Sequence, residues 1–317
     1  MLNRFVMIMV GLDGVGKTTL LSTMYHELSR IDNPAGFEVA ASEDTHRDLH
    51  DAYKKLSTIL AQPTFTPTWP LLKGTAGIVE RQFEILFKGK KELELVLCDI
   101  AGGLVRAKEG NPDFDELKNK LEEAIVIMNV IDGSVLVEGD ELLSIQKNDP
   151  AQIYKLLLPI LRQGKNYLIL FVITKCEAWL KNEKTRKQLE TAFETQYEMI
   201  LKLIEGLDNV VGVLIPVKTM GCVEFTRIDS KGEEKEVIFV RKPNLRFKPV
   251  DIEQPQRYAL AFALVQHNQH RSQWNKFMRW FWNEDVAFQK ALTEFAEGRS
   301  RSFKIYGNLS LIEVTES

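Results

Sequence analysis

The stretch GLDGVGKTT, residues 11–19, constrains this chain more than any other part of its sequence. It fits the pattern G-x-x-x-x-G-K-[ST], in which glycines at both fixed positions are followed by lysine and threonine. The preceding run, Arg4–Val10, is apolar and rich in β-forming residues, so it predicts a buried strand. Residues Thr18–Arg30 space their apolar side chains as an amphipathic helix does. The sequence therefore predicts a strand, a glycine-rich turn and a helix in succession.

A loop of this kind is suited to hold phosphate groups. Glycines let the backbone turn sharply and bring its N–H groups close to an anion, and the helix N-terminus adds the positive end of its dipole. The Lys17 side chain can reach the terminal phosphates, and the Thr18 hydroxyl can ligate Mg²⁺. We expect the nucleotide-binding residues of this loop to be Gly11, Asp13, Gly14, Val15, Gly16, Lys17, Thr18 and Thr19.

Composition excludes several classes of protein. The chain has 317 residues, of which 44% are hydrophobic and 27% charged, as in ordinary globular proteins. A net charge of −3 gives no overall field that favours nucleic acid or an anionic membrane, so neither is an expected partner. The apolar N-terminus runs directly into the phosphate loop, so we expect it to stay in the folded protein. Cys98, Cys176 and Cys222 lack metal-ligand spacing and are expected to be reduced thiols of a cytoplasmic protein.

Further along, buried strands alternate with helices. Strands that are apolar on both faces and alternate with helices predict an α/β fold, with a mainly parallel sheet covered by helices on both faces. A hairpin about the turn KGKK is expected within Ile78–Gly103. The other expected strands lie within 124–134, 167–177 and 210–221, and the expected helices within 45–60, 151–164, 181–207 and 256–267.

Ligands of such sheets bind at the carboxyl ends of the strands, where polar residues are therefore informative. Asp99 ends the second hairpin strand, and Gly102 follows it in the pattern D-x-x-G. The carboxylate can hold Mg²⁺ through water, and the glycine amide can donate to the terminal phosphate. A strand-ending aspartate in an ordinary glycine turn is the alternative interpretation.

Two later strand ends can recognise a base. The segment Thr174–Glu177 (TKCE) carries a carboxylate that can accept two hydrogen bonds from guanine, whereas adenine offers no such pair of donors. The aliphatic stem of Lys175 can lie along the base. In PVKTMG, residues 216–221, a backbone N–H near Lys218 or Thr219 could donate to the guanine oxygen. The alternatives are a charged strand exit and an ordinary surface loop.

Taken together, these segments resemble a Ras-like P-loop GTPase with the G-domain fold. GLDGVGKTT is especially similar to the ADP-ribosylation-factor branch, whose loop carries an aspartate at the position of Asp13. GTAG (Gly74–Gly77) is similar to the T-x-G of that branch. The resemblance covers about residues 2–264. The stretch Trp69–Thr75 and the long insert also resemble bacterial double-GTPase proteins.

The resemblance implies roles for individual residues. Thr75 would ligate Mg²⁺ through its hydroxyl and touch the γ-phosphate through its amide, with Thr64, Thr66 and Thr68 as alternatives in the same loop. The implied catalytic residues are Lys17, Thr75 and Gly102, and the implied Mg²⁺ ligands are Thr18, Thr75 and Asp99. The function implied is a GTP/GDP switch that hydrolyses GTP and signals to a protein effector or activating partner. An ATPase or nucleotide kinase, and an assembly module without significant hydrolysis, are the alternatives.

Two positions depart from the family pattern. Glu177 stands where the family has aspartate, so the extra methylene moves the carboxylate by about 1.5 Å, one carbon–carbon bond. Gly103 stands where the family usually has a glutamine that orients the attacking water. We therefore expect slow hydrolysis unless another residue or a partner supplies that group. Arg106 is a candidate donor in cis, and a solvent-facing arginine is the alternative.

The C-terminal part is expected to differ from the nucleotide-binding part. We divide the chain into a GTPase-like domain, residues 1–268 with a hairpin insert at about 223–242, and a helical extension, residues 269–317. In Arg271–Phe295, aromatic side chains recur on one helical face, which favours a buried face over a partner-binding or membrane-surface helix. The tail Ser302–Val314 could add a strand.

Overall fold

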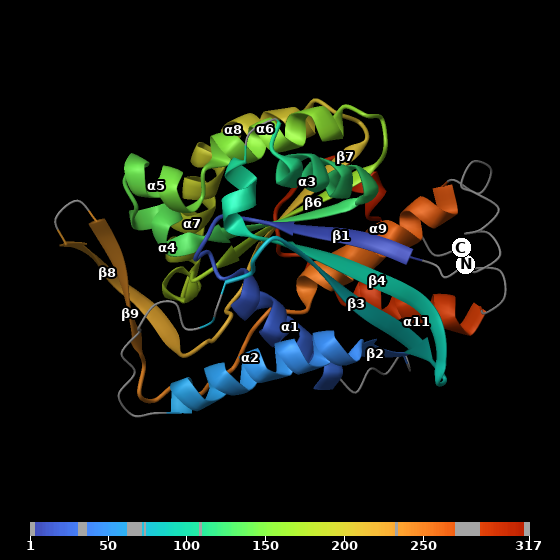
Figure 1. Cartoon of the computed structure of the whole chain (residues 1–317), viewed down its shortest axis with the longest axis horizontal. Coiled ribbons are helices and arrows are strands. Elements are labelled where there is room, and N and C mark those ends of the chain that lie inside the picture. Colours follow the sequence, from blue (N-terminus) through green and yellow to red (C-terminus); the bar gives the residue numbers. More distant parts are fainter. Residues whose placement is uncertain are drawn as a thin grey trace.

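A mixed sheet of eight strands runs through the centre of the molecule (Figure 1). The computed structural model describes residues 4–30, 37–61, 72, 74–107, 110–231, 234–269 and 286–313. The strand order in the sheet is β10-β7-β6-β5-β1-β4-β3-β2. Their bounds are β1 Arg4–Val10, β2 Phe37–Ala41, β3 Ile78–Phe87, β4 Lys90–Ile100, β5 Val126–Asp132, β6 Tyr167–Thr174, β7 Val210–Pro216 and β10 Ile305–Gly307.

Parallel pairing dominates the middle of this sheet. Strands β4, β1, β5, β6 and β7 pair with one another in parallel, whereas β2, β3 and β10 join by antiparallel pairing. The β3–β4 hairpin turns at Lys88 and Gly89, both with positive φ, as the sequence KGKK predicts. The expected α/β fold with a mainly parallel sheet is confirmed.

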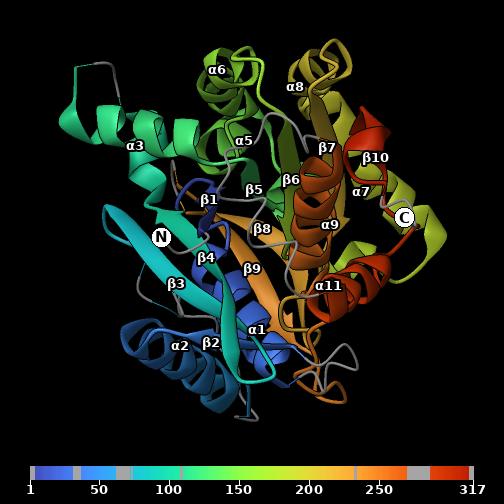
Figure 2. The ribbon, with the colours of Figure 1, turned by 90° about the vertical axis from the view of Figure 1, so that its right-hand side faces the viewer.

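Helices cover both faces of the sheet (Figure 2). In the two ribbon views α3, α6 and α8 lie on one face, and α1, α9 and α11 on the other. The described helices are α1 Lys17–Arg30, α2 Glu43–Ala61, α3 Pro112–Glu123, α4 Gly133–Glu138, α5 Glu141–Lys147, α6 Pro150–Leu161, α7 Glu183–Gln196, α8 Glu198–Glu205, α9 Gln254–Gln269 and α11 Val286–Glu297. Short 3-10 helices, η1 Gly102–Arg106, η2 Glu177–Trp179 and η3 Leu309–Leu311, complete the order. Among the described residues, no helix is both long and apolar enough to cross a membrane.

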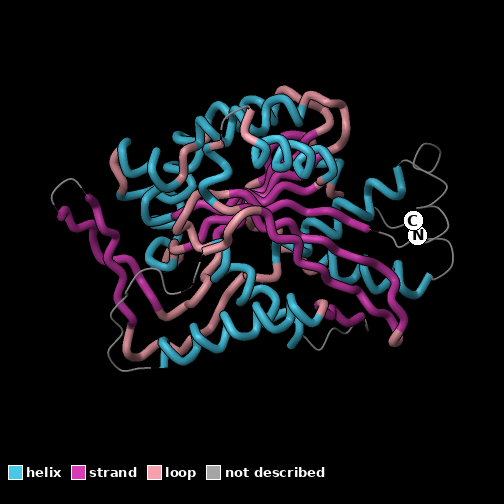
Figure 3. Tube along the Cα trace, viewed as in Figure 1, coloured by secondary structure: helices cyan, strands magenta, loops and turns pink. Residues whose placement is uncertain are grey.

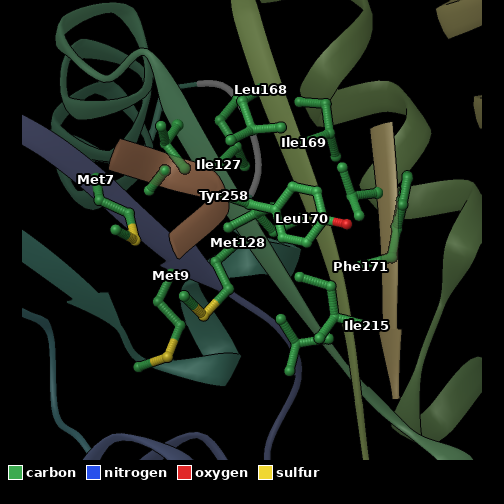
Figure 4. Close-up of a cluster of buried hydrophobic side chains, with 14 of the residues drawn as sticks. Met7, Met9, Ile127, Met128, Leu168, Ile169, Leu170, Phe171, Ile215 and Tyr258 are labelled. Atoms are coloured by element: carbon green, nitrogen blue, oxygen red, sulfur yellow. The ribbon is translucent and has the colours of Figure 1, made fainter. Parts of the chain in front are cut away.

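The central strands are buried on both sides. Every residue of β5, β6 and β7 is buried, as their uninterrupted apolar sequences predict. In the core, Met7 and Met9 of β1 lie beside Met128 of β5, with Phe171 of β6 and Tyr258 of α9 further along (Figure 4). All three cysteines are buried and free, which agrees with the expected reduced thiols.

One local expectation is wrong, and one strand was not predicted. The single helix expected over 181–207 is two helices, because the chain leaves helical geometry at Tyr197 (φ −100°, ψ 12°). The tyrosine ring is buried there, with its centroid 4.9 Å from that of Phe193 and 5.9 Å from that of Phe171. Strand β2 was not expected from the sequence. It is a short edge strand that depends on pairing with β3.

The insert after β7 is a hairpin of its own, as expected. Strands β8 Val223–Lys231 and β9 Glu234–Arg241 form a separate two-stranded sheet that projects from the body of the molecule (Figure 3). At the base of this hairpin, Val223 and Phe239 form a small apolar cluster with Leu56 and Leu60 of α2. The insert is therefore anchored at its base.

The C-terminal part continues the main fold. Helix α11 packs against α9, and Leu292 and Phe295 of α11 belong to the main core. Strand β10 pairs antiparallel with β7, so the strand expected in the tail is confirmed. Residues 270–285, which include most of the aromatic face expected in 271–295, lie outside the described residues.

Candidate nucleotide-binding site

The phosphate loop lies between β1 and α1, at the carboxyl end of β1. Gly11 has φ +150°, and a Cβ added to it would lie 2.7 Å from the carbonyl oxygen of Val130. Gly16 has φ +103°, and its added Cβ would lie 3.4 Å from Oγ1 of Thr174. The loop therefore turns in a conformation that favours glycine and packs closely against the ends of β5 and β6.

Lys17 begins α1 and lies over this loop. Its side chain is only 7% exposed, and Nζ donates to the carbonyl oxygens of Gly11 at 2.6 Å and Leu12 at 3.2 Å. Burial lowers the pKa of Lys17, while the carboxylates of Asp99 and Asp13 oppose that shift. The ammonium group is thus held at the mouth of the loop, where a phosphate would compensate its loss of hydration.

Asp99 and Thr75 meet beside the loop. Asp99 is fully buried near the end of β4, and its Oδ2 accepts a hydrogen bond of 2.7 Å from the Thr75 hydroxyl. The Nε atom of Arg81 lies 3.9 Å from the same oxygen. Burial raises the pKa of Asp99, against the opposing effects of Thr75, Lys17 and Arg81. Of the four candidate threonines, the structure places Thr75 at Asp99, and Thr64, Thr66 and Thr68 lie outside the described residues.

A cavity of about 280 Å³ adjoins these groups, and it is lined by Asp13, Gly14, Gly16, Lys17, Thr18, Thr19, Leu72, Gly74, Thr75 and Lys147. Oδ1 of Asp99 is buried and has no hydrogen-bond partner among the described residues. One carboxylate with two hydroxyls suits Mg²⁺, which prefers oxygen ligands and completes its shell with phosphate and water. The residues therefore fit a Mg²⁺ held by Thr18, Thr75 and Asp99.

The two glycines that follow β4 have different surroundings. A Cβ added to Gly102 would lie 2.3 Å from the backbone nitrogen of Asp13 and 2.6 Å from the carbonyl carbon of Leu12. A Cβ added to Gly103 would meet no atom within 4 Å. Gly102 therefore lets the chain pack directly on the phosphate loop, whereas the position of the missing glutamine has free space.

Arg106 does not line the cavity. Its Nε lies 3.5 Å from Oδ2 of Asp149, and its Nη2 donates to the carbonyl oxygen of Ile145. The guanidinium group thus joins η1 to the connection between α5 and α6. The expectation that Arg106 is a donor in cis is not supported by this geometry, because its Nε and Nη2 atoms face these two acceptors and the residue does not line the cavity.

The first two residues of TKCE bind the phosphate loop. The Thr174 hydroxyl donates to the carbonyl oxygen of Val15 at 2.5 Å, and Nζ of Lys175 donates to that of Gly14 at 2.5 Å. Lys175 also forms an ion pair of 2.6 Å with Oδ2 of Asp132, at the end of β5. These contacts join the ends of β5 and β6 to the loop.

Glu177 lies beside the last loop of the expected base site. Its Oε1 accepts hydrogen bonds from the backbone amides of Met220 at 3.2 Å and Gly221 at 3.5 Å. Burial raises the pKa of Glu177, while these amides and Lys218 act in the opposite direction. The carboxylate is thus brought next to residues 216–221.

The expectation for the Lys218 amide requires correction. The Lys218 N–H donates to the carbonyl oxygen of Val250 at 3.1 Å, within a bridge between the two residues, and so cannot donate to a base. The neighbouring amide of Thr219 has no acceptor within the described residues. Of the two proposed donors, Thr219 remains.

The sequence analysis missed two charged residues of the site. Asp132 holds Lys175 and also accepts from the amides of Ser134 and Val135, which begin α4. Its place at the end of β5 is the same signal that identified Asp99, so it could have been found. Lys147 carries no local signal, because only the path of α5 brings it to the cavity.

A parallel sheet flanked by helices, with a phosphate loop and D-x-x-G after neighbouring strands, defines a P-loop GTPase fold. The Double-GTPase 2 family model matches residues 6–205, more than half of the chain. The chain therefore belongs to the Double-GTPase 2 family, and the double-GTPase resemblance is confirmed. This membership and the fold support GTP binding. Among curated proteins, none matches the chain.

Solved structures of GTPases are similar to the chain at low identity. The signal recognition particle receptor SRb-GTP/SRX complex from Chaetomium thermophilum is 14% identical over 68% of this chain and 91% of that one, with a TM-score of 0.37. The S. cerevisiae Ski7 GTPase-like domain, bound to GDP and inorganic phosphate, is 18% identical over 68% and 43%, with a TM-score of 0.40. The small COPII coat GTPase SAR1 from Encephalitozoon cuniculi, in complex with GDP, is 12% identical over 68% and 70%, with a TM-score of 0.33.

Proposed function

We propose that this protein is a cytoplasmic guanine-nucleotide switch that binds GTP with Mg²⁺, hydrolyses it slowly to GDP and presents its state to a protein partner. The observation that carries the proposal is that Lys17 and Thr75 line one cavity, while Asp99 accepts from the Thr75 hydroxyl. Gly102 packs against Asp13, which also lines that cavity. These groups come from three separate segments of the chain, and each matches a part that P-loop GTPases use on the β- and γ-phosphates.

The residues of the phosphate end would bind and orient the triphosphate. Backbone amides of the loop and the ammonium group of Lys17 would neutralise the phosphates, in a position that excludes much of the water. Thr18, Thr75 and Asp99 would hold Mg²⁺, which when bound would supply positive charge to offset that of the phosphates. With Gly103 in place of glutamine, no side chain at that position orients the attacking water, which is why we propose slow hydrolysis.

The switch itself would be carried by the segments of Thr75 and Gly102. Both lie next to the cavity, and both can contact a γ-phosphate that is present in GTP and absent in GDP. Loss of that phosphate would remove the contact that draws these segments together, so a partner could distinguish the two states.

Guanine selection is assigned to Glu177 and to the amide of Thr219. The carboxylate is buried beside residues 216–221, and a buried acceptor that pairs with guanine donors disfavours adenine. We further propose residues 1–268 as the nucleotide-binding domain and 269–317 as an extension whose α11 and β10 pack on it.

The test is a titration of purified protein with fluorescent GDP and Mg²⁺, followed by competition with unlabelled GTP and ATP. We expect GTP to displace the probe and ATP to fail at similar concentrations. Equal displacement by ATP would contradict guanine selection and support the ATPase alternative. Phosphate release measured over hours would then separate a slow GTPase from an assembly module that does not hydrolyse GTP.

A further inference from the structure

Lys147 is a positively charged residue of the cavity to which neither the sequence motif nor the family pattern gives a role. It is the last residue of α5 and lines the cavity together with Asp13, Lys17 and Thr75. It is partly buried, and it forms no ion pair or hydrogen bond with the part of the chain that the structure describes. Lys17 differs, because its Nζ already donates to two loop carbonyls.

The backbone around Lys147 is fixed by buried contacts. The next residue, Asn148, is 2% exposed, and its side chain exchanges two hydrogen bonds with the backbone of Asp132, at 2.9 and 3.1 Å. At the other end of α5, the Asp140 side chain accepts from the Leu143 amide at 3.0 Å. The lysine is thus presented to the cavity by a short helix that is held at both ends.

Both α5 and the start of α6, which follows it directly, contact the segment after Gly102. Arg106 of η1 pairs with Asp149 at 3.5 Å and donates to the carbonyl oxygen of Ile145. The side chain of Gln152 donates to the carbonyl oxygen of Val105 at 2.9 Å. Arg106 therefore links the D-x-x-G segment to the helix that carries Lys147.

We propose, on the basis of the proposed function, that Lys147 is a catalytic residue that supplies positive charge to the γ-phosphate from within the chain. In the hydrolysis step, the water oxygen forms a bond to the γ-phosphorus, and the bond to the bridging oxygen breaks with its electron pair left on GDP. The proton of the water passes to the released phosphate. Lys147 exchanges no proton and stabilises the negative charge of the transition state.

The inference is tested by single-turnover GTP hydrolysis of Lys147→Ala and Lys147→Arg, with GDP affinity measured in parallel. We expect Lys147→Ala to slow hydrolysis by about 10- to 1,000-fold, as loss of one preorganised donor does. Its GDP affinity should stay within about threefold, since GDP lacks the γ-phosphate that the lysine contacts. Lys147→Arg should retain most of the rate. Lys155→Ala, an exposed lysine on α6, is the matched control and should equal the wild type.

Aluminium fluoride with GDP gives a second readout, because it mimics the charge of the transferred phosphoryl group. Wild-type protein should form this complex without a partner, and Lys147→Ala should not. Unchanged hydrolysis in Lys147→Ala, an equal loss of GDP affinity, or a wild type that binds GTP without hydrolysing it would each overturn the inference. Failure of the wild type to bind guanine nucleotides would instead contradict the proposed function.

Discussion

The phosphate end of the site and its base end are held together in different ways. At the phosphate end, glycine backbone packs on backbone, as at Gly11 against Val130 and at Gly102 against Asp13. At the base end, a buried side chain, Glu177, binds backbone amides of a loop that also contacts Val250. The first arrangement tolerates almost no change of residue type, whereas the second depends on side-chain length and on distant segments. If the proposed function holds, the comparison implies that binding strength and base selectivity have separate structural origins.

The largest expected effect tests whether the phosphate end supplies most of the affinity. Replacing Lys17 with alanine removes the ammonium group that donates to the Gly11 and Leu12 carbonyls, and we expect GDP affinity to fall by about 100-fold or more, about 3 kcal/mol. Titration with fluorescent GDP measures this loss, with Lys155→Ala as control and circular dichroism to check folding. A GDP affinity within threefold of that of the wild type would contradict the idea that the phosphate end supplies most of the affinity.

The next effect concerns the packing of glycine on the loop. In Gly102→Ala the new methyl group would lie 2.3 Å from the Asp13 nitrogen, so the free energy of unfolding should fall by about 2–3 kcal/mol. In Gly103→Ala the methyl group meets nothing within 4 Å, and the change should stay within about 0.5 kcal/mol. Urea unfolding of the two variants measures the difference. Equal effects would show that the close approach at Gly102 is not rigid.

At the base end, the variant Glu177→Gln tests whether the carboxylate of this residue selects guanine over adenine. Glutamine keeps an oxygen acceptor for the amides of Met220 and Gly221 but loses the negative charge that favours guanine donors. We expect GTP affinity to fall by about tenfold, while ATP affinity stays the same. Competition titrations measure both, and Glu183→Gln, an exposed glutamate of α7, is the control. A parallel loss of GTP and ATP affinity would assign Glu177 to folding instead of base selection.

The smallest effect is the pH dependence that Glu177 gives to stability. Burial raises the pKa of the Glu177 carboxyl group in the folded protein. The folded protein therefore keeps this group protonated to a higher pH than the unfolded chain does. The contribution of Glu177 to the free energy of unfolding is therefore most favourable below the pKa that it has in the unfolded chain. It is lost as the pH rises through the pKa that it has in the folded protein. Unfolding free energies of wild type and Glu177→Gln, measured from pH 4 to 8 without nucleotide, should diverge in favour of the variant as pH rises. If the unfolding free energies of the two proteins changed with pH in parallel, Glu177 would not be the source of the pH dependence.

The residues that the sequence singled out around the phosphate loop lie together in the structure, and the reason that they could be recognised is geometric. Positions such as Gly11, Gly16 and Gly102 accept almost no other residue type, so their spacing is visible in one sequence. Asp99 was recognisable because a buried strand ends in a charged residue. These signals are local, and they identified the fold class as well as the cavity.

What the sequence could not predict depends on contacts between distant segments. The Lys218 amide is occupied by Val250, which lies 32 positions later, and nothing local indicates that pairing. Lys147 reaches the cavity only through the path of α5, and the break at Tyr197 reflects the burial of its ring against Phe171. Tertiary packing decided each of these points.

The hydrogen bonds from Thr174 and Lys175 to the loop carbonyls have a kinetic consequence. They tie the phosphate loop to the end of β6, so the loop cannot open without breaking both bonds. We therefore expect spontaneous exchange of bound nucleotide to be slow. On the proposed function, a factor that accelerates exchange would act on the end of β6, where one movement would disturb both the phosphate loop and the segment of Glu177.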